Sequence, residues 1–109
     1  MKPIGIALAL VLAGCGDVCD HAQSTSADVQ QKGGPCNDTV NTFNHDKCEK
    51  GLSSCTSNDL QVLNNLLNCL DNLSTCSPAT KNGWEGMKSD CDNLAGGVTL
   101  NCLLAVTGT

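Results

Sequence analysis

The most regular alternation of apolar and polar residues in this chain begins at Leu60. At 100° per residue, the leucines, Val and cysteines up to Cys76 fall in one arc of about 200°, and amides and hydroxyls fill most of the remainder. Thr56 or Ser57 can cap this segment, and Asp59 is favourable near the positive end of the helix dipole. The pattern predicts a buried amphipathic helix with two cysteines at one edge of its apolar face.

Three further segments are predicted to be helical. One begins with Ser77 as N-cap and Pro78 at the first helical position, and it ends at Gly96 and Gly97. Residues 37–54 form another helix that bends or breaks before Gly51, because its two apolar groups lie on different faces. Residues 98–106 fit a strand or a short helix, and we predict a helix because the other segments are helical. The expected fold is all-α, a small disulfide-stapled bundle of three to four helices.

The N-terminus has the features of an export signal. Lys2 precedes the apolar run 4–13, which would be about 15 Å long as a helix and therefore too short to span a bilayer. The residues Leu12-Ala13-Gly14-Cys15 resemble the lipobox of bacterial lipoproteins. This resemblance implies cleavage before Cys15 and lipidation of its thiol. The same resemblance makes the outer membrane the expected location in the cell envelope, because in such lipoproteins an Asp after the lipidated cysteine favours inner-membrane retention, and this chain has Gly16 there.

Three regions are expected along the chain. Residues 1–14 form the lipoprotein signal peptide. Residues 15–35 form a lipid-anchored flexible tether, because most of this stretch is polar and it ends in Gly-Gly-Pro. The sixteen flexible residues 20–35 would reach about 22 Å. Residues 36–109 form the cystine-rich helical domain.

The cysteine count supports both the anchor and an oxidising compartment. Nine cysteines in 109 residues are typical of a disulfide scaffold, which persists only outside the reducing cytosol. With Cys15 assigned to lipidation, an even number remains, enough for four disulfides. The eight are Cys19, Cys36, Cys48, Cys55, Cys69, Cys76, Cys91 and Cys102.

The pairing of these eight cysteines follows from an assumed antiparallel arrangement. Across a turn near residues 56–58, opposite residues have numbers that sum to about 112–117. A second turn near 76–78 places Cys91 level with residue 63, at the end of the bundle where Cys55 is expected. Of the 105 possible connectivities, this argument favours Cys36–Cys76, Cys48–Cys69, Cys55–Cys91 and Cys19–Cys102.

Charge and composition argue against several classes of function. The chain from Cys15 onward carries five Lys, no Arg and eleven carboxylates, a net charge of −6 with neutral His, which opposes binding to nucleic acid. It has no C-x-x-C motif and no strand–turn–helix frame for a nucleophilic Ser, so no enzymatic activity and no cofactor are expected. His21 near Cys19 and His45 near Cys48 could bind a metal, but those thiols are needed for the disulfides. No metal site is therefore expected.

We therefore expect a lipoprotein of the cell envelope, held on the membrane by its N-terminal lipid, with a structural or protein-interaction role toward an envelope protein partner. One alternative is a lipid-binding carrier. The design of eight cysteines and helices is similar to that of plant lipid-transfer proteins, which enclose an apolar tunnel with four disulfides. A metal-binding module is the remaining alternative.

Overall fold

A computed structural model describes residues 3–38 and 42–107 of the chain, with side chains from Val18 onward. All secondary structure among these residues is helical, which confirms the all-α, disulfide-rich fold, with five α-helices in place of three to four. The elements are α1 (Pro3–Gly33), η1 (Gly34–Cys36), α2 (His45–Gly51), η2 (Leu52–Ser54), α3 (Ser57–Asp71), η3 (Pro78–Thr80), α4 (Lys81–Asp92), η4 (Asn93–Gly97) and α5 (Leu100–Thr107).

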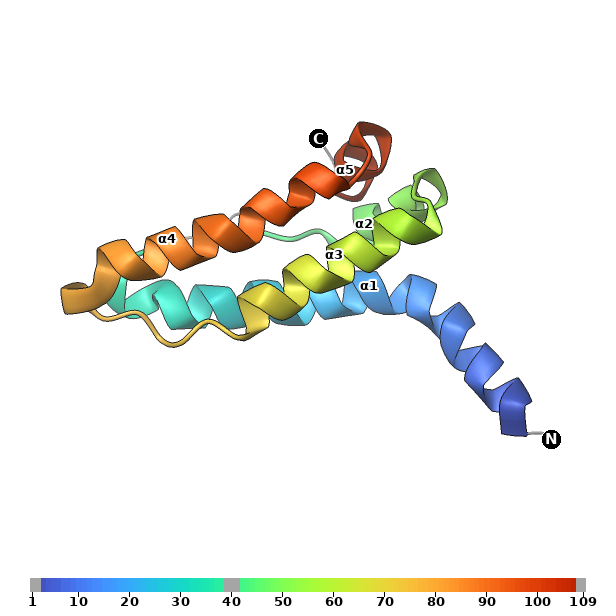
Figure 1. Cartoon of the computed structure of the whole chain (residues 1–109), viewed down its shortest axis with the longest axis horizontal. Coiled ribbons are helices and arrows are strands. Elements are labelled where there is room, and N and C mark those ends of the chain that lie inside the picture. The colour runs from blue at the N-terminus through green and yellow to red at the C-terminus, as the bar shows by residue number, and fades with distance from the viewer. Residues whose placement is uncertain (1–2, 39–41, 108–109) are drawn as a thin grey trace.

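The three longest helices follow the long dimension of the molecule, and the two shortest lie together at one end (Figure 1). Helix α1 packs against α3 and α2, α4 packs against α3, and α5 packs against α2. Two groups of buried residues result. One contains Val18, Leu63 and Val106 at the α2–α5 end. The other surrounds Trp84, whose indole donates a hydrogen bond of 2.6 Å to the Ser74 carbonyl oxygen.

Helix α3 begins as its sequence predicts. Thr56 is the N-cap: its hydroxyl accepts from the Asp59 backbone N–H, and Asp59 accepts from the Thr56 backbone N–H in return. The Asp59 carboxylate also accepts from the N–H and hydroxyl of Thr99, at 2.9 and 2.8 Å. Hydrogen bonds from Thr99 and then Thr56 lower the pKa of Asp59, whose side chain is almost completely covered. The start of α3 is thereby fixed to the residues that precede α5. The helix ends at Asp71, before the predicted Cys76.

The prediction of a flexible tether over residues 15–35 is wrong. This segment is helical through Gly33, and Val18, Thr25 and Val29 are each at most 3% exposed. Val18, Thr25 and Val29 recur at helical spacing and α1 packs against α3, so a stretch with few large apolar residues still has a buried face. The folded domain therefore begins by Val18 and not at Cys36.

The remaining predicted helices are confirmed only in part. Helix α2 begins at His45, with Asn44 as its N-cap, so the predicted helix over 37–54 starts eight residues late. Val40, within the predicted helix, lies outside the described residues. Ser77 precedes η3, which begins at Pro78 and continues into α4, and η4 extends this helical segment to Gly97. The final segment is a helix, as predicted.

All eight cysteines outside the lipobox form disulfides, but only one predicted pair is present. The bridges are Cys19–Cys48, Cys36–Cys76, Cys55–Cys102 and Cys69–Cys91, with Cα–Cα distances of 5.7, 6.0, 4.6 and 5.5 Å. The predictions Cys48–Cys69, Cys55–Cys91 and Cys19–Cys102 are wrong. They were derived with residues 15–35 as a flexible tether, whereas this segment belongs to α1, which lies against α2 and supplies Cys19 to Cys48. Cys55 is then bridged by α5, and Cys69 by α4.

Candidate functional site

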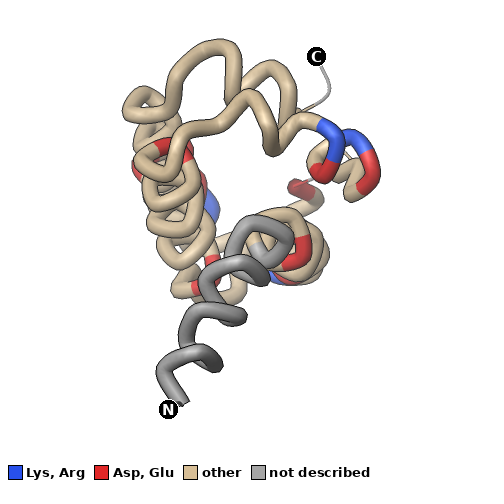
Figure 2. Tube along the Cα trace, turned by 90° about the vertical axis from the view of Figure 1, so that its right-hand side faces the viewer, with Lys and Arg blue, Asp and Glu red and all other residues tan. Residues whose placement is uncertain are grey.

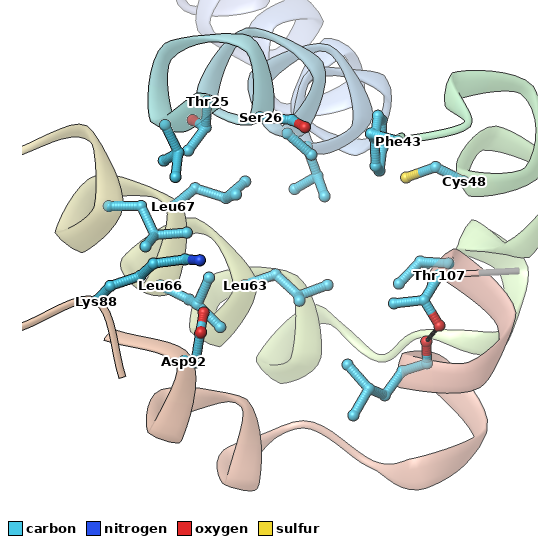
Figure 3. A pocket seen from close by; sticks show the side chains of 16 residues that line it. Thr25, Ser26, Phe43, Cys48, Leu63, Leu66, Leu67, Lys88, Asp92 and Thr107 are labelled. Carbon is cyan, nitrogen blue, oxygen red and sulfur yellow. Dashed lines mark hydrogen bonds between the residues drawn. The ribbon is translucent and has the colours of Figure 1, made fainter. Parts of the chain in front are cut away.

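A partly open cavity of about 430 Å³ lies inside the bundle (Figure 3). Its lining includes members of both buried groups, so it lies between them. Volumes of roughly 300–1,000 Å³ are usual for small-molecule sites. The lining residues come from most of the helices: Val18, Ala22, Thr25, Ser26, Val29, Phe43, Cys48, Leu63, Leu66, Leu67, Leu70, Lys88, Asp92, Leu103, Val106 and Thr107.

The long walls of the cavity come from α1 and α3. On α1 the lining residues recur at spacings of three and four, from Val18 through Ala22 and Ser26 to Val29, so they share one face of the helix. Their small size leaves space opposite the leucines of α3. On α3 the leucines Leu63 and Leu67 face the same space, and Figure 3 shows them opposite α1. The cavity thus follows from small residues on one helix facing large ones on another.

The charged residues that line the cavity, Lys88 and Asp92, both lie on α4. The Lys88 Nζ lies 3.1 Å from a carboxylate oxygen of Asp38 and 5.9 Å from the centre of a Trp84 ring. Asp92, one helical turn beyond Lys88, also lines the cavity. Partial burial raises the pKa of Asp92, and the charge of Lys88 acts in the opposite direction. Lys88 therefore has nearby carboxylates to balance its charge, and this part of the cavity offers hydrogen-bonding groups without an unpaired cation.

Two histidines take part in contacts that hold α1, one wall of the cavity, against α3 and α2. His21 Nε2 lies 2.7 Å from Asp71 Oδ2 on α3, and the Thr25 hydroxyl donates to the other oxygen of Asp71 at 2.7 Å. Burial lowers the pKa of His21, but hydrogen bonds with Asp71 and Asn64 outweigh it, so the pKa is raised above its ordinary value. His45 on α2 lies 2.6 Å from a carboxylate oxygen of the neighbouring Asp20. Adjacent residues of α1 thus hold two different helices in place.

The residues singled out as possible metal ligands have other partners. Cys19 and Cys48 are bridged to each other, and His45 is within hydrogen-bonding distance of Asp20, so a disulfide and a hydrogen bond join the two histidine-containing segments. Among the described residues, Cys55, Cys102 and Asp59 also lie close enough to suggest a metal site. The first two form a disulfide, and the Asp59 oxygens accept the hydrogen bonds already given. These three residues are therefore structural.

Sequence reasoning did not find the cavity. The predicted lipidation site, Cys15, lies outside the described side chains. The sequence-based prediction assigned the residues of the α1 wall to a flexible tether. The pattern that could have identified them as one face of a helix is the spacing of Val18, Ala22, Ser26 and Val29. The leucines of α3 were correctly placed on one face, but only the tertiary structure shows that part of that face borders empty space.

No family model, no curated protein and no solved structure matches this chain. In the part of the chain that the structure describes, no helix combines the length and the apolar character needed to cross a membrane.

Proposed function

We propose that this protein is a lipoprotein of the bacterial cell envelope, anchored at Cys15, whose helical domain binds an apolar, lipid-like molecule without catalysing a reaction. The observation that carries the binding role is the leucine-lined cavity between α1 and α3. Of the two roles expected from the sequence, the cavity favours the lipid-binding one. The anchor rests on the lipobox and on the pairing of every other cysteine in a disulfide.

The chemistry of the lining indicates the class of ligand. Apolar surface buried from water contributes about 25 cal/mol per Å², so an acyl chain gains binding free energy along the Leu63 and Leu67 wall. Lys88 already pairs with Asp38, which disfavours a ligand whose affinity depends on an anionic headgroup. Asp92 and Ser26 can exchange hydrogen bonds with a hydroxyl. We therefore propose a single-chain lipid with a small uncharged, hydroxyl-bearing head.

Location follows from the anchor. A diacylglycerol on the Cys15 thiol together with an N-acyl chain would hold the protein on the membrane, because stable anchoring takes more than one chain. Gly16 after the lipidated cysteine favours the outer membrane. The intact mass of protein extracted from membranes tests this directly. A chain that begins at lipidated Cys15 supports the proposal, and an unlipidated chain contradicts it.

Binding is tested by native mass spectrometry for retained lipid and by titration with N-phenyl-1-naphthylamine, an uncharged apolar dye. Ala22→Trp places a large side chain in the cavity, and Ala27→Trp adds the same ring at an exposed position of the same helix. We expect Ala22→Trp to weaken binding at least about tenfold, which corresponds to 1.4 kcal/mol, and Ala27→Trp to bind as the natural chain does. Equal binding by both variants, or no binding by the natural chain, would contradict the proposal.

A structural or protein-interaction role is the second candidate. The face of α3 that points away from the bundle is exposed and carries uncharged amides, and the Cys69–Cys91 bridge ties this helix to α4. The exposed residues are Gln61, Asn65 and Asn68. Cross-linking in intact cells from this face, with a matched site on α4 as control, would identify an envelope partner if this role is the main one.

A further inference from the structure

We infer that the domain rests directly on the bilayer through an uncharged surface at its α2–α5 end, with Leu100 and Leu104 in the membrane interface. This inference rests on the proposed anchor at Cys15. It adds an orientation, because it states which end of the bundle faces the lipid and which surface touches it.

The first argument is the short distance between the anchor and the rigid domain. Val18 and Cys19 are 2% and 0% exposed, and Cys19 is bridged to Cys48. Only two residues separate Cys15 from Val18. Even a fully extended chain spans at most about 3.6 Å per residue, so Val18 lies within about 11 Å of the lipidated residue. A domain held so closely cannot swing free of the headgroups.

The second argument is what surrounds Val18. It packs in one buried group with Cys48 of α2 and with Cys102 and Val106 of α5. The end of the bundle that carries the anchor is therefore the α2–α5 end, where both short helices lie in Figure 1. Trp84 and the Cys36–Cys76 bridge belong to the other buried group.

The third argument is the composition of that end. Residues 51–58 and 93–107 contain no charged side chain, and the Cys55–Cys102 bridge joins the two stretches. We call their exposed residues the uncharged surface. Figure 2 looks at this end of the molecule and shows the charged residues of α2 at one side and an uncharged rim above. On α2, Asp46 and Glu49 balance two lysines, Lys47 and Lys50.

The apolar residues of the uncharged surface point outward. Leu100 and Leu104 are 66% and 42% exposed, while Cys102 and Val106 of the same helix are buried. A spacing of four residues places the two leucines on one side of α5. The chain from Cys15 onward is acidic overall, and its charged surfaces would be repelled by anionic lipids. The uncharged surface can approach the bilayer without that repulsion and bury two leucines there.

The test uses full-length protein, processed and extracted from membranes, and reconstituted into vesicles of phosphatidylethanolamine and phosphatidylglycerol with brominated acyl chains. Bromine quenches an indole that enters the acyl region. Leu104→Trp places an indole on the uncharged surface. Met87→Trp is the matched control, because Met87 is also an exposed apolar residue, 48% exposed, on α4. The natural Trp84 is 1% exposed in the other buried group and gives the background emission.

We expect quenching and a blue shift of the Leu104→Trp emission in these vesicles, and neither for Met87→Trp beyond the background. Vesicle flotation and intact mass are measured on the same samples. Protein that floats with its lipid but shows no quenching for Leu104→Trp would overturn the inference and leave the anchor intact. Protein that carries no lipid and does not float would overturn the anchor and the inference together. A blue shift that depends on protein concentration, without quenching, would assign the leucines to a second copy of the chain and overturn the inference.

Discussion

Gly51, the last residue of α2, is the position where the addition of one methyl group is predicted to be most damaging. Its φ and ψ of −84° and −11° are ordinary helical values that alanine adopts without strain. The constraint is space. A Cβ at Gly51 would lie 2.5 Å from the Ala105 carbonyl carbon and 2.9 Å from the Val106 backbone nitrogen, and closer still to the Ala105 oxygen.

The cost of Gly51→Ala can be worked from these contacts. Normal carbon–carbon contact is about 3.5 Å, so α5 would have to withdraw by roughly 1 Å. The obstructing atoms are backbone, and the Cys55–Cys102 bridge and the buried Val106 oppose the movement. Overpacking of this kind costs about 1–3 kcal/mol, which exceeds the gain of up to about 1 kcal/mol from replacing glycine by alanine in a helix. We expect net destabilisation of about 1–2 kcal/mol.

Urea denaturation followed by circular dichroism measures this change on the oxidised protein. Gly86→Ala is the matched control, because Gly86 lies within α4 and a Cβ there meets no atom within 4 Å. That variant should be more stable than the natural chain by about 0.5–1 kcal/mol. If Gly51→Ala were as stable as Gly86→Ala, the close approach of α2 and α5 would be refuted.

Three further outcomes follow from the packing and the charges. Trp84→Ala should cost about 3–5 kcal/mol in denaturant unfolding, because it empties a fully buried site. Replacing both Cys69 and Cys91 by Ser should cost about 3 kcal/mol in the same assay, as expected for a loop of 22 residues. Because the pKa of His21 is raised in the folded state, the contact between His21 and Asp71 stabilises the fold fully below pH 6.5, and this stabilisation is lost as the pH rises through the folded pKa. The pKa of Asp71 is lowered, so its contribution is lost only when the pH falls below about 3.8. Stability measured between pH 5.5 and 8 should therefore decrease with pH by less than about 1 kcal/mol, and His21→Gln should flatten this decrease.

The cavity and the proposed membrane orientation depend on features that a linear pattern does not reveal. Ala22 and Ser26 carry no strong signal of burial, and their role appears only because α3 places leucines opposite them. Leu100 and Leu104 have the same sequence character as buried leucines. Their exposure is decided by Cys102 and Val106, which take the inner side of a helix two turns long.

The sequence by itself determined the helical class, a cap of α3 at Thr56 or Ser57, the start of a helical segment at Pro78, and the even set of eight disulfide cysteines. These features depend on neighbours within about one helical turn, or on a count. Only the tertiary structure decided that residues 18–33 belong to the folded domain and which cysteines meet. Pairing depends on which helices lie side by side, and one helix assigned to a tether changes the partner of every cysteine near it. The Cys36–Cys76 pair was predicted correctly, and the displaced partners of Cys48, Cys55 and Cys69 follow from the position that α1 occupies.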